Sequence, residues 1–316
     1  MTAGMILAAG FGTRLGSLSD ERPKPLLPVA DTPLIRYALA LLHAADVRRV
    51  VVNLHHRGDL IEEELGSAVV YSREDRILGT GGGIRRALPL LGDEAFFVVN
   101  GKILLDVDLA EVMAAHRASG AAATLVVRPD PDARRWGAID APPEGGPIRS
   151  ILGDGEFMFT GVHVIEPSLI ARFPDDSAER CVVKQGYIPW IAEGVPIHAF
   201  VAHGYFMEHS TPARYLEGNR NVLRGIATLR HPPGALVGVD PTARIDPRAV
   251  VIPPVRIGPG AEVSRDATVG PDVVVGARAI VAPGVALSEA VVWSDARVVT
   301  DARRAIVTPR QRVDVE

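Results

Sequence analysis

A glycine-rich turn near the start of the chain carries residue types that bind phosphate groups. The apolar run Met5–Ala9 is typical of a buried strand, and it is followed directly by Gly10, Gly12, Thr13 and Arg14. Glycines let backbone N–H groups approach phosphate oxygens closely, and a guanidinium binds the same oxygens in a bidentate manner. This turn is therefore expected to hold the phosphates of a ligand.

A second cation, Lys24, lies between Pro23 and Pro25, which restrict the backbone around it. A buried strand, a basic turn and a fixed lysine together predict a site for a nucleoside triphosphate. The alternative is that the glycines only turn the chain between a strand and a helix, and a glycine turn alone does not separate the two interpretations. The added Arg14 and Lys24 favour the nucleotide site.

Two other glycine motifs are excluded. The chain has no G-x-x-x-x-G-K-[ST] segment, so it lacks a P-loop. Gly10, Gly12 and Gly16 are one residue out of step with the dinucleotide fingerprint, and the expected strand Val50–Leu54 ends without the acidic residue that would bind a ribose. A nucleotide-dependent oxidoreductase is therefore disfavoured.

The elements that must position these residues alternate between short apolar runs and helical patterns up to about Ala202. Helices are predicted after Thr32 and from Leu109 to Ala118, where Gly120 ends the pattern. Such alternation favours a largely parallel sheet covered by helices, with ligands at the carboxyl ends of the strands. The predicted strands are Met5–Ala9, Val50–Leu54, Ala68–Tyr71, Ala95–Val99, Ala122–Val127, Thr160–Ile165 and Ile197–Val201.

A different pattern follows the Pro-Pro-Gly segment at residues 232–234. Apolar residues recur there every six residues, at Val239, Ile245, Val251, Ile257, Val263, Val269, Val275, Val281 and Leu287. This period is typical of a left-handed parallel β-helix, in which each hexapeptide forms one side of a triangular coil. No histidine follows His231, so acyl transfer with a histidine base is not expected in this part.

The turn and several later segments resemble those of the sugar-1-phosphate nucleotidyltransferases over about residues 3–228. The resemblance is carried by Ala8–Leu15, Lys24–Val29, Leu78–Ile84, Val99–Leu104, Phe159–Val164 and Gly204–Leu216. These motifs look most like those of mannose-, heptose- and N-acetylmuramate-1-phosphate enzymes, which join a nucleoside triphosphate to a sugar 1-phosphate and release pyrophosphate. The resemblance implies a mannose- or heptose-like sugar, with GTP favoured.

The resemblance also implies a fold: a Rossmann-like mixed sheet (GT-A-like) in an α/β nucleotidyltransferase domain. That domain is expected at residues 1–230, and the β-helix domain of hexapeptide repeats at residues 231–316. Several sugar nucleotidyltransferases carry such a tail for self-association, so a homo-oligomer formed through the β-helix is expected.

The resemblance further implies three sets of site residues. In-line attack of a sugar phosphate on an α-phosphate needs positioning and neutralisation of charge more than covalent catalysis. The implied catalytic residues are Arg14, Lys24 and Lys102. The implied nucleotide contacts are Ala8, Ala9, Gly10, Gly12, Thr13, Gly79, Thr80 and Gly81. The implied sugar contacts are Asn100, Gly101, Thr160, Gly161 and Glu179.

Two of these sets have structural alternatives. Gly79–Gly83 precedes a helix expected at Ile84–Leu90, so the glycines admit a base and ribose or merely form a turn before the helix. Glu179 fits a sugar hydroxyl less well than it fits a solvated surface acid.

The metal site departs from the family pattern. The family usually binds Mg²⁺ through two aspartates, but this chain has Lys102 and Glu208 at those positions. A lysine cannot ligate Mg²⁺, which takes oxygen ligands. Mg²⁺ is therefore a family expectation, and no metal ligand is assigned in this chain. We hypothesise that Lys102 pairs with Glu208 where the metal would lie.

Two functions follow from this departure. In the first, the protein is an enzyme in which Lys102 supplies part of the metal's charge, or Mg²⁺ enters on the phosphates of the nucleotide. In the second, it is a catalytically silent protein that binds a nucleotide or sugar nucleotide and regulates a partner. The retained Arg14 and Lys24 favour the enzyme, whereas the replaced aspartates favour the silent protein.

Composition limits the remaining classes. A net charge of −4 over 316 residues gives no reason to expect nucleic-acid binding. Cys181 is the one cysteine, which fits a reducing cytoplasm. No apolar run approaches the ~20 residues of a membrane span, so no membrane partner is expected. The only lysines are Lys24, Lys102 and Lys184, in a chain that otherwise uses arginine.

Overall fold

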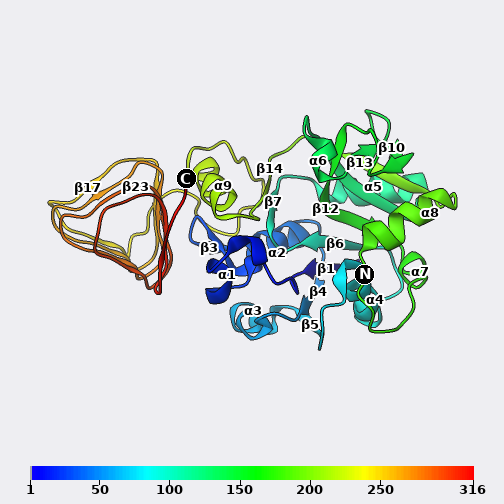
Figure 1. The fold of residues 1–316 in the computed structure, drawn as a ribbon, viewed down its shortest axis with the longest axis horizontal. Helices are drawn as coiled ribbons and strands as arrows, with labels where there is room; N and C mark the ends of the chain where they lie inside the picture. Colours follow the sequence, from blue (N-terminus) through cyan, green and yellow to red (C-terminus); the bar gives the residue numbers. More distant parts are fainter. Residues whose placement is uncertain (1) are drawn as a thin grey trace. The chain divides into compact units, whose positions relative to one another are not determined.

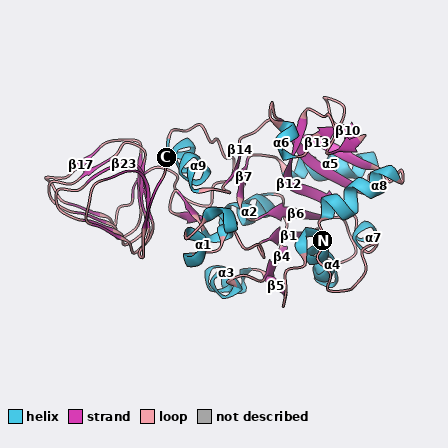
Figure 2. Ribbon diagram, viewed as in Figure 1, coloured by secondary structure: helices cyan, strands magenta, loops and turns pink. Residues whose placement is uncertain are grey.

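The computed structural model describes residues 2–316, which form two compact units. The first unit comprises residues 2–11, 21–25 and 38–204, and the second comprises residues 12–20, 26–37 and 205–316. Figure 1 follows the chain from blue to red, and Figure 2 separates helices from strands. The division into domains 1–230 and 231–316 stays a prediction.

The first unit is built around a mixed sheet (Figure 2). β1 is parallel to both β4 and β6, whereas β12 is antiparallel to both β6 and β8. The expectation of a largely parallel sheet is thus corrected to the mixed sheet that the resemblance implied. In spatial order the strands are β10 (Gly146–Pro147), β13 (Ile197–Val201), β8 (Ala123–Pro129), β12 (Phe157–Ile165), β6 (Phe96–Asn100), β1 (Ala3–Leu7), β4 (Arg49–Leu54) and β5 (Val70–Arg73).

Helices cover this sheet and share its apolar core. Ile84, Ala87 and Leu91 of α4 are buried in one cluster with Met5 of β1 and Val51 of β4. Because their outward neighbours on α4 are polar or half-buried, the helix docks by one apolar stripe. The helices of the chain are α1 (Leu18–Glu21), α2 (Leu34–Ala44), α3 (Gly58–Leu65), α4 (Gly79–Leu91), α5 (Leu109–Ser119), α6 (Ala133–Trp136), α7 (Pro167–Ile170), α8 (Ile188–Ala192) and α9 (Pro212–Leu223).

Two predicted helices are found with small corrections. α5 begins after Asp108, whose side chain accepts hydrogen bonds from Ala110 N and Glu111 N, and it ends at Gly120 in the left-handed region. α2 begins at Leu34, but Thr32 and Pro33 form a short strand instead of a cap. The short strands outside the order given above are β2 (Pro28–Val29), β3 (Thr32–Pro33), β7 (Ile103–Leu105), β9 (Ile139–Asp140), β11 (Ser150–Ile151) and β14 (Phe206–Glu208).

The second unit contains a parallel β-helix with three strands in each coil. Gly238 pairs with Arg256, Arg244 with Glu262 and Val250 with Thr268, each 18 residues further along the chain. Three hexapeptides therefore make one coil, as the six-residue period predicts. The strands are β15 (Gly238–Val239), β16 (Arg244–Ile245), β17 (Val250–Val251), β18 (Val255–Ile257), β19 (Glu262–Val263), β20 (Thr268–Val269), β21 (Val273–Val275), β22 (Ile280–Val281), β23 (Ala286–Val292), β24 (Arg297–Val298), β25 (Ala302–Val307) and β26 (Arg312–Asp314).

The periodic apolar residues fill the inside of the coils. Ile257, Val269 and Val275 are fully buried, whereas Val239 in the first coil is 46% exposed because no earlier coil covers it. The last strand departs from the repeat, since β26 runs antiparallel to β25. The coil thus continues regularly only as far as β25.

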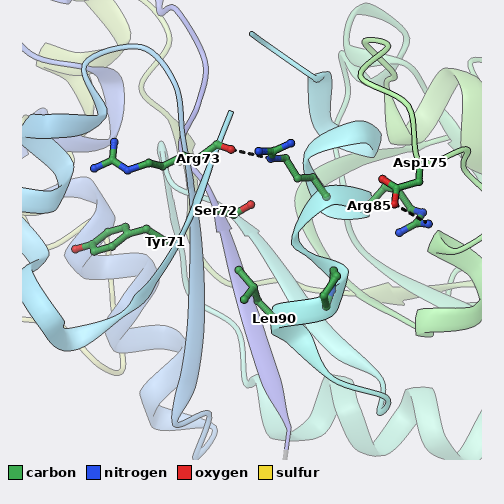
Figure 3. Close-up of a pocket in the computed structure, with 8 residues that line it drawn as sticks. Tyr71, Ser72, Arg73, Arg85, Leu90 and Asp175 are labelled. Carbon is green, nitrogen blue, oxygen red and sulfur yellow. Dashed lines mark hydrogen bonds and ion pairs between the residues drawn. The ribbon is translucent and has the colours of Figure 1, made fainter. Parts of the chain in front are cut away.

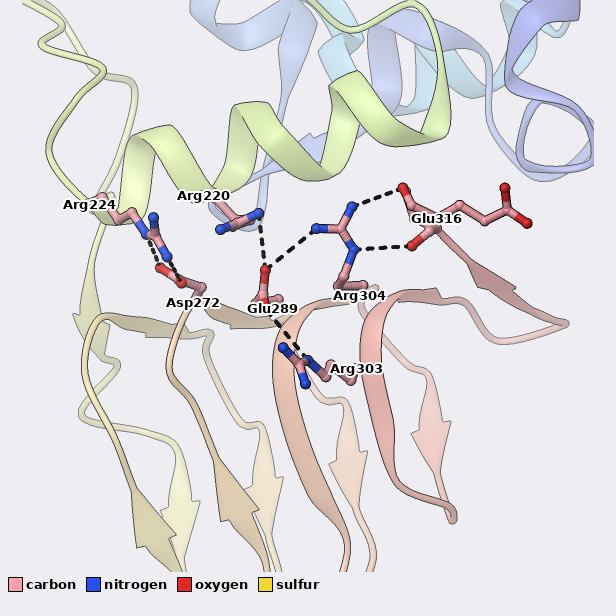
Figure 4. Close-up of polar contacts among 8 residues, drawn as sticks. Arg220, Arg224, Asp272, Glu289, Arg303, Arg304 and Glu316 are labelled. Carbon is pink, nitrogen blue, oxygen red and sulfur yellow. Dashed lines mark hydrogen bonds and ion pairs between the residues drawn. The ribbon is translucent and has the colours of Figure 1, made fainter.

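Helix α9 is held against the coils by charged side chains within the second unit (Figure 4). Arg224 donates two hydrogen bonds to Asp272, at 2.9 and 2.6 Å, and the Asp272 side chain is only 2% exposed. Glu289 lies 3.0 Å from Arg220 and also contacts Arg303 and Arg304. These acids are therefore compensated by arginines from both the helix and the coils.

Within the described residues, no helix is both long and apolar enough to span a membrane.

Replacing Arg224 by alanine is expected to lower the midpoint of thermal unfolding by several degrees. The Asp272 carboxylate would stay buried and lose both N–H donors. The matched control is Arg303→Ala, because Arg303 is exposed and lies 3.6 Å from Glu289, which keeps Arg220. Differential scanning calorimetry measures both, and equal midpoints for the two variants would contradict this account.

Candidate active site

The phosphate turn leaves the sheet where three strands end side by side. β1 stops at Leu7, two residues earlier than expected, because Ala8 N turns to donate a hydrogen bond to Asn53 Oδ1 at 2.7 Å. Gly101 N donates to Leu7 O at 3.0 Å. The turn, the end of β4 and the loop after β6 therefore meet at one carboxyl edge of the first unit, where ligands bind in such sheets.

The first residues of the turn combine a buried backbone with an exposed glycine. Ala8 and Ala9 are buried, whereas Gly10 is exposed and a Cβ added to it would meet no atom within 4 Å. Phe11 is 51% exposed, and its ring lies 5.6 Å from the rings of both His55 and His56. The site thus has open space beside Gly10 and an aromatic group beside Phe11.

Arg14 faces the carboxylate of Glu208 within the second unit. Gly12 adopts the left-handed conformation, which starts the short 3₁₀ turn Thr13–Leu15. Arg14 Nη2 then lies 3.6 Å from Glu208 Oε1, with the two side chains 57% and 24% exposed. The position that carries a metal-binding aspartate in related enzymes therefore carries here an acid that pairs with a phosphate-binding candidate.

The two candidate lysines belong to the first unit. Lys24 is buried at the start of the 3₁₀ turn Lys24–Leu26, and Lys102 is half-buried in the turn between β6 and β7. A Cβ on Gly101 would lie 3.6 Å from Pro25 Cβ, so the two turns are neighbours. Because Glu208 belongs to the second unit, its pairing with Lys102 stays a prediction.

The glycines Gly79–Gly83 form the first turns of α4 instead of preceding it, so the expected helix begins five residues too late. Their small size is used by the chain itself. Gly81 N donates to Arg180 O at 2.8 Å, and Thr80 Oγ1 accepts a hydrogen bond from Val182 N at 2.9 Å. The predicted nucleotide contacts of Gly79, Thr80 and Gly81 stay predictions, beside this observed structural role.

The predicted sugar contacts lie at a bulge of β12. The pairing of β12 with β8 shifts between Phe159 and Val162, and Gly161 there is in the left-handed region, against Asn100. Thr160 is 2% exposed, and its hydroxyl donates to Val126 O at 2.7 Å. Its hydroxyl therefore stabilises the bulge, which leaves Asn100 and Gly101 as the better placed candidates.

Glu179 lies on the exposed segment before Arg180. The segment contacts the start of α4 through backbone atoms of its neighbours, as Arg180 N donates to Leu78 O at 2.8 Å. The surface position agrees with the alternative of a solvated acid, and its contact with a sugar stays a prediction.

Two buried polar residues that sequence reasoning did not assign lie behind the turn. Asn53 Nδ2 donates to Glu74 Oε1 at 2.7 Å, and Glu74 Oε2 accepts from Leu78 N at 3.0 Å. Burial raises the pKa of the Glu74 carboxyl, and the hydrogen bonds from Asn53 and Leu78 oppose that rise. The available signal was an asparagine at the end of an apolar strand, where a dinucleotide-binding chain would carry an acid.

A separate cleft of about 530 Å³ lies between β5 and α4 (Figure 3). Its arginines are already engaged: Arg85 contacts Asp175, Arg86 donates to Arg73 O, and Arg73 pairs with Glu62. Among the described residues, those that line this cleft include none of the predicted site residues. It is therefore not part of the candidate active site.

Comparison with known proteins agrees with this geometry. The model of the nucleotidyl transferase family matches residues 3–152. The mannose-1-phosphate guanylyltransferase of Mycobacterium tuberculosis is 30% identical over 235 residues, which are 71% of this chain and 65% of that protein. The chain belongs to the nucleotidyl transferase family.

Other relatives of this nucleotidyl transferase extend the comparison. The mannose-1-phosphate guanyltransferase of Candida albicans is 29% identical over 269 residues, 77% of this chain and 72% of that protein. HddC from Yersinia pseudotuberculosis, solved in a complex with GMP-PN, superposes with a TM-score of 0.60 at 23% identity and covers 70% of this chain and 99% of that chain. At that identity the structural likeness establishes the fold alone.

Nucleotidyl transferases of this family are typically Mg²⁺-dependent, but the residues here do not fit a protein-bound ion. Lys102 has no oxygen ligand to offer, and the Glu208 carboxylate lies against Arg14. Within residues 2–316 there is no group of three or more histidines, cysteines, aspartates and glutamates arranged to hold a metal. The charge at this site must therefore be balanced by side chains.

Gly79→Ala is expected to destabilise this nucleotidyl transferase by about 1–3 kcal/mol more than Gly92→Ala. Both glycines have positive φ, so both variants share the cost of the left-handed backbone. Only at Gly79 would the new Cβ meet a backbone atom, Arg180 O, at 2.5 Å, whereas nothing lies within 4 Å at Gly92. Urea unfolding measures the difference, and equal losses would show that the contact with Arg180 is unimportant.

Proposed function

We propose that this nucleotidyl transferase joins a nucleoside triphosphate to a sugar 1-phosphate, giving a nucleoside diphosphate sugar and pyrophosphate. GTP and a mannose- or heptose-like sugar are the favoured substrates. The observation that carries the proposal is the phosphate turn at the carboxyl edge of β1, beside the loop of Gly101 and Lys102. The mannose-1-phosphate enzymes among the relatives and the GMP-PN complex of HddC support the choice of sugar and base.

The reaction needs charge more than a covalent catalyst. An oxygen of the sugar phosphate attacks the α-phosphorus in line, and the bond from that phosphorus to its bridging oxygen breaks as pyrophosphate leaves. The backbone of Gly10, Gly12 and Thr13 and the side chain of Arg14 bind the triphosphate, while Lys24 neutralises charge at the reacting phosphates.

Lys102 supplies the remaining positive charge in this proposal. Two aspartates with one Mg²⁺ sum to zero charge, and so do Lys102 and Glu208. Glu208 orients Arg14 until the triphosphate offers stronger phosphate acceptors. The site is thereby neutral before the substrates bind, although the family carboxylates are replaced.

The second candidate is a catalytically silent protein that binds a nucleotide or sugar nucleotide and regulates a partner. The observation that favours it is the ion pair of Arg14 with Glu208, which occupies a phosphate-binding guanidinium. A cytoplasmic location and a homo-oligomer formed through the β-helix are part of both proposals.

The deciding experiment measures pyrophosphate release from four nucleoside triphosphates, each with mannose 1-phosphate, a heptose 1-phosphate and N-acetylmuramate 1-phosphate. Each pair is tested with Mg²⁺ and with EDTA. Release that resists EDTA supports Lys102 as the replacement cation, and release only with Mg²⁺ supports entry of the ion on the nucleotide. Binding of a nucleotide without any release would support the silent protein.

Arg14→Ala is expected to reduce kcat/KM by about 10²–10³-fold, because it removes a cation aimed at charge that develops in the transition state. The loss should be similar with and without EDTA. A decrease below threefold in the pyrophosphate assay would contradict the role given to Arg14.

Lys102→Ala is expected to abolish EDTA-resistant release, and Lys102→Asp to make release depend on added Mg²⁺, since a carboxylate is an oxygen ligand. Lys184→Ala is the matched control, because Lys184 is the chain's exposed lysine on another segment. Release from Lys102→Ala in EDTA at the wild-type rate would rule out Lys102 as the replacement cation.

A further inference from the structure

A chain of buried hydrogen bonds joins the phosphate turn to the start of α4 within the first unit. It runs from Ala8 N to Asn53 Oδ1 at 2.7 Å, from Asn53 Nδ2 to Glu74 Oε1 at 2.7 Å, and from Leu78 N to Glu74 Oε2 at 3.0 Å. The two side chains come from different segments, the end of β4 and the loop after β5. The bonds therefore connect two segments that are far apart in sequence.

The direction of each hydrogen bond is fixed by chemistry. The backbone N–H groups of Ala8 and Leu78 can only donate, so each must meet an oxygen. The amide oxygen of Asn53 must then face Ala8, which turns its NH₂ group toward the carboxylate of Glu74. An asparagine and a glutamate satisfy this chain in one order only.

The pair is closely enclosed. Asn53 is 3% and Glu74 5% exposed. A Cβ on Gly83 would lie 2.7 Å from Glu74 Oε1 and 3.0 Å from Asn53 Nδ2, so α4 leaves room for the pair by having a glycine there. The backbone of Glu74 is held as well, by Leu54 O at 2.8 Å from its N and by His55 Nδ1 at 2.9 Å from its O.

We propose that Asn53 and Glu74 are positioning residues, which set the spacing between the phosphate turn at Ala8–Gly10 and the start of α4 at Gly79–Gly81. The inference rests on the proposed function, because both segments are candidate nucleotide contacts. Neither side chain touches the nucleotide. Their effect is to hold two binding segments at one separation, so that a bound nucleotide does not have to order them.

The test exchanges the chemical groups of the pair. In Glu74→Gln, the new NH₂ group must face either the NH₂ of Asn53 or Leu78 N, so one donor loses its acceptor. In Asn53→Asp, two carboxylates face each other. In the double variant Asn53→Asp/Glu74→Gln, the new amide at position 74 donates to the new carboxylate at position 53, while Ala8 N and Leu78 N each keep an oxygen. The double variant thus restores every bond with the charge moved to the other member of the pair.

The expected result is measured as the dissociation constant of a fluorescent GTP analogue. Each single variant is expected to weaken binding at least about tenfold, and the double variant to return to within about threefold of the wild type. Where pyrophosphate release is present, KM for GTP should rise more than kcat falls. Glu193→Gln is the matched control, because Glu193 is an exposed acid that pairs with Arg172.

Asn53→Asp also predicts a pH dependence that a purely structural loss would not produce. At low pH the two facing carboxyls share a proton and bond to each other, so binding stays near the wild-type value. As the pH rises the proton is lost, the carboxylates repel, and binding weakens. Besides Asn53 and the Leu78 N–H, the groups that act on the Glu74 carboxyl are His55 and Arg86, and both remain in every variant. The wild type and the double variant should lack this dependence.

The outcomes separate this inference from the proposed function. Single variants that bind the GTP analogue as the wild type does would overturn the positioning role, whether or not pyrophosphate is released. So would a double variant no better than the singles, or a wild type that binds no nucleotide. Wild-type protein that binds the analogue but releases no pyrophosphate would contradict the proposed enzyme, and rescue by the double variant would still support the positioning role.

Discussion

Parallel hydrogen bonding of β1 to β4 on one side and to β6 on the other places three strand ends at one edge of the first unit. Every candidate site residue of that unit that lies near the turn depends on this pairing. The phosphate turn follows β1, Asn53 ends β4, and the loop of Gly101 and Lys102 follows β6. Because backbone N–H groups at such an edge need partners, the side-chain oxygen of Asn53 takes the one that leaves the ladder first.

Charge is balanced locally throughout the described chain, and the candidate site follows the same principle. Arg14 lies against Glu208, as Arg224 lies against Asp272 and Arg220 against Glu289. The structural pairs hold α9 to the coils, where a buried acid without its cation would be costly. The pair at Arg14 is more exposed, so a phosphate can compete for the guanidinium at little cost. A site without metal ligands is consistent with a chain that uses arginine–acid pairs so widely.

Local patterns in the sequence predicted the elements that depend on periodic burial. The six-residue period predicted the coil, because each inward side chain must be apolar at a constant spacing, and the observed pairs lie 18 residues apart. The apolar runs predicted the central strands, and Asp108 and Gly120 predicted the ends of α5. The start of α4 was placed too late, because the glycines Gly79–Gly83 look like a turn until the backbone of Arg180 is seen to need their space.

By itself, then, the sequence determined the order of the chemistry-bearing segments, the basic phosphate turn, the β-helix and the loss of the family's metal ligands. Each of these is a matter of residue type at a short spacing. Only the tertiary structure decided that Asn53 meets Glu74, that Glu208 meets Arg14, and that the Thr160 hydroxyl stabilises a bulge. Those contacts join residues far apart along the chain. A polar side chain's partner is set by which backbone groups remain unsatisfied after the strands and helices have packed, and no local pattern encodes that.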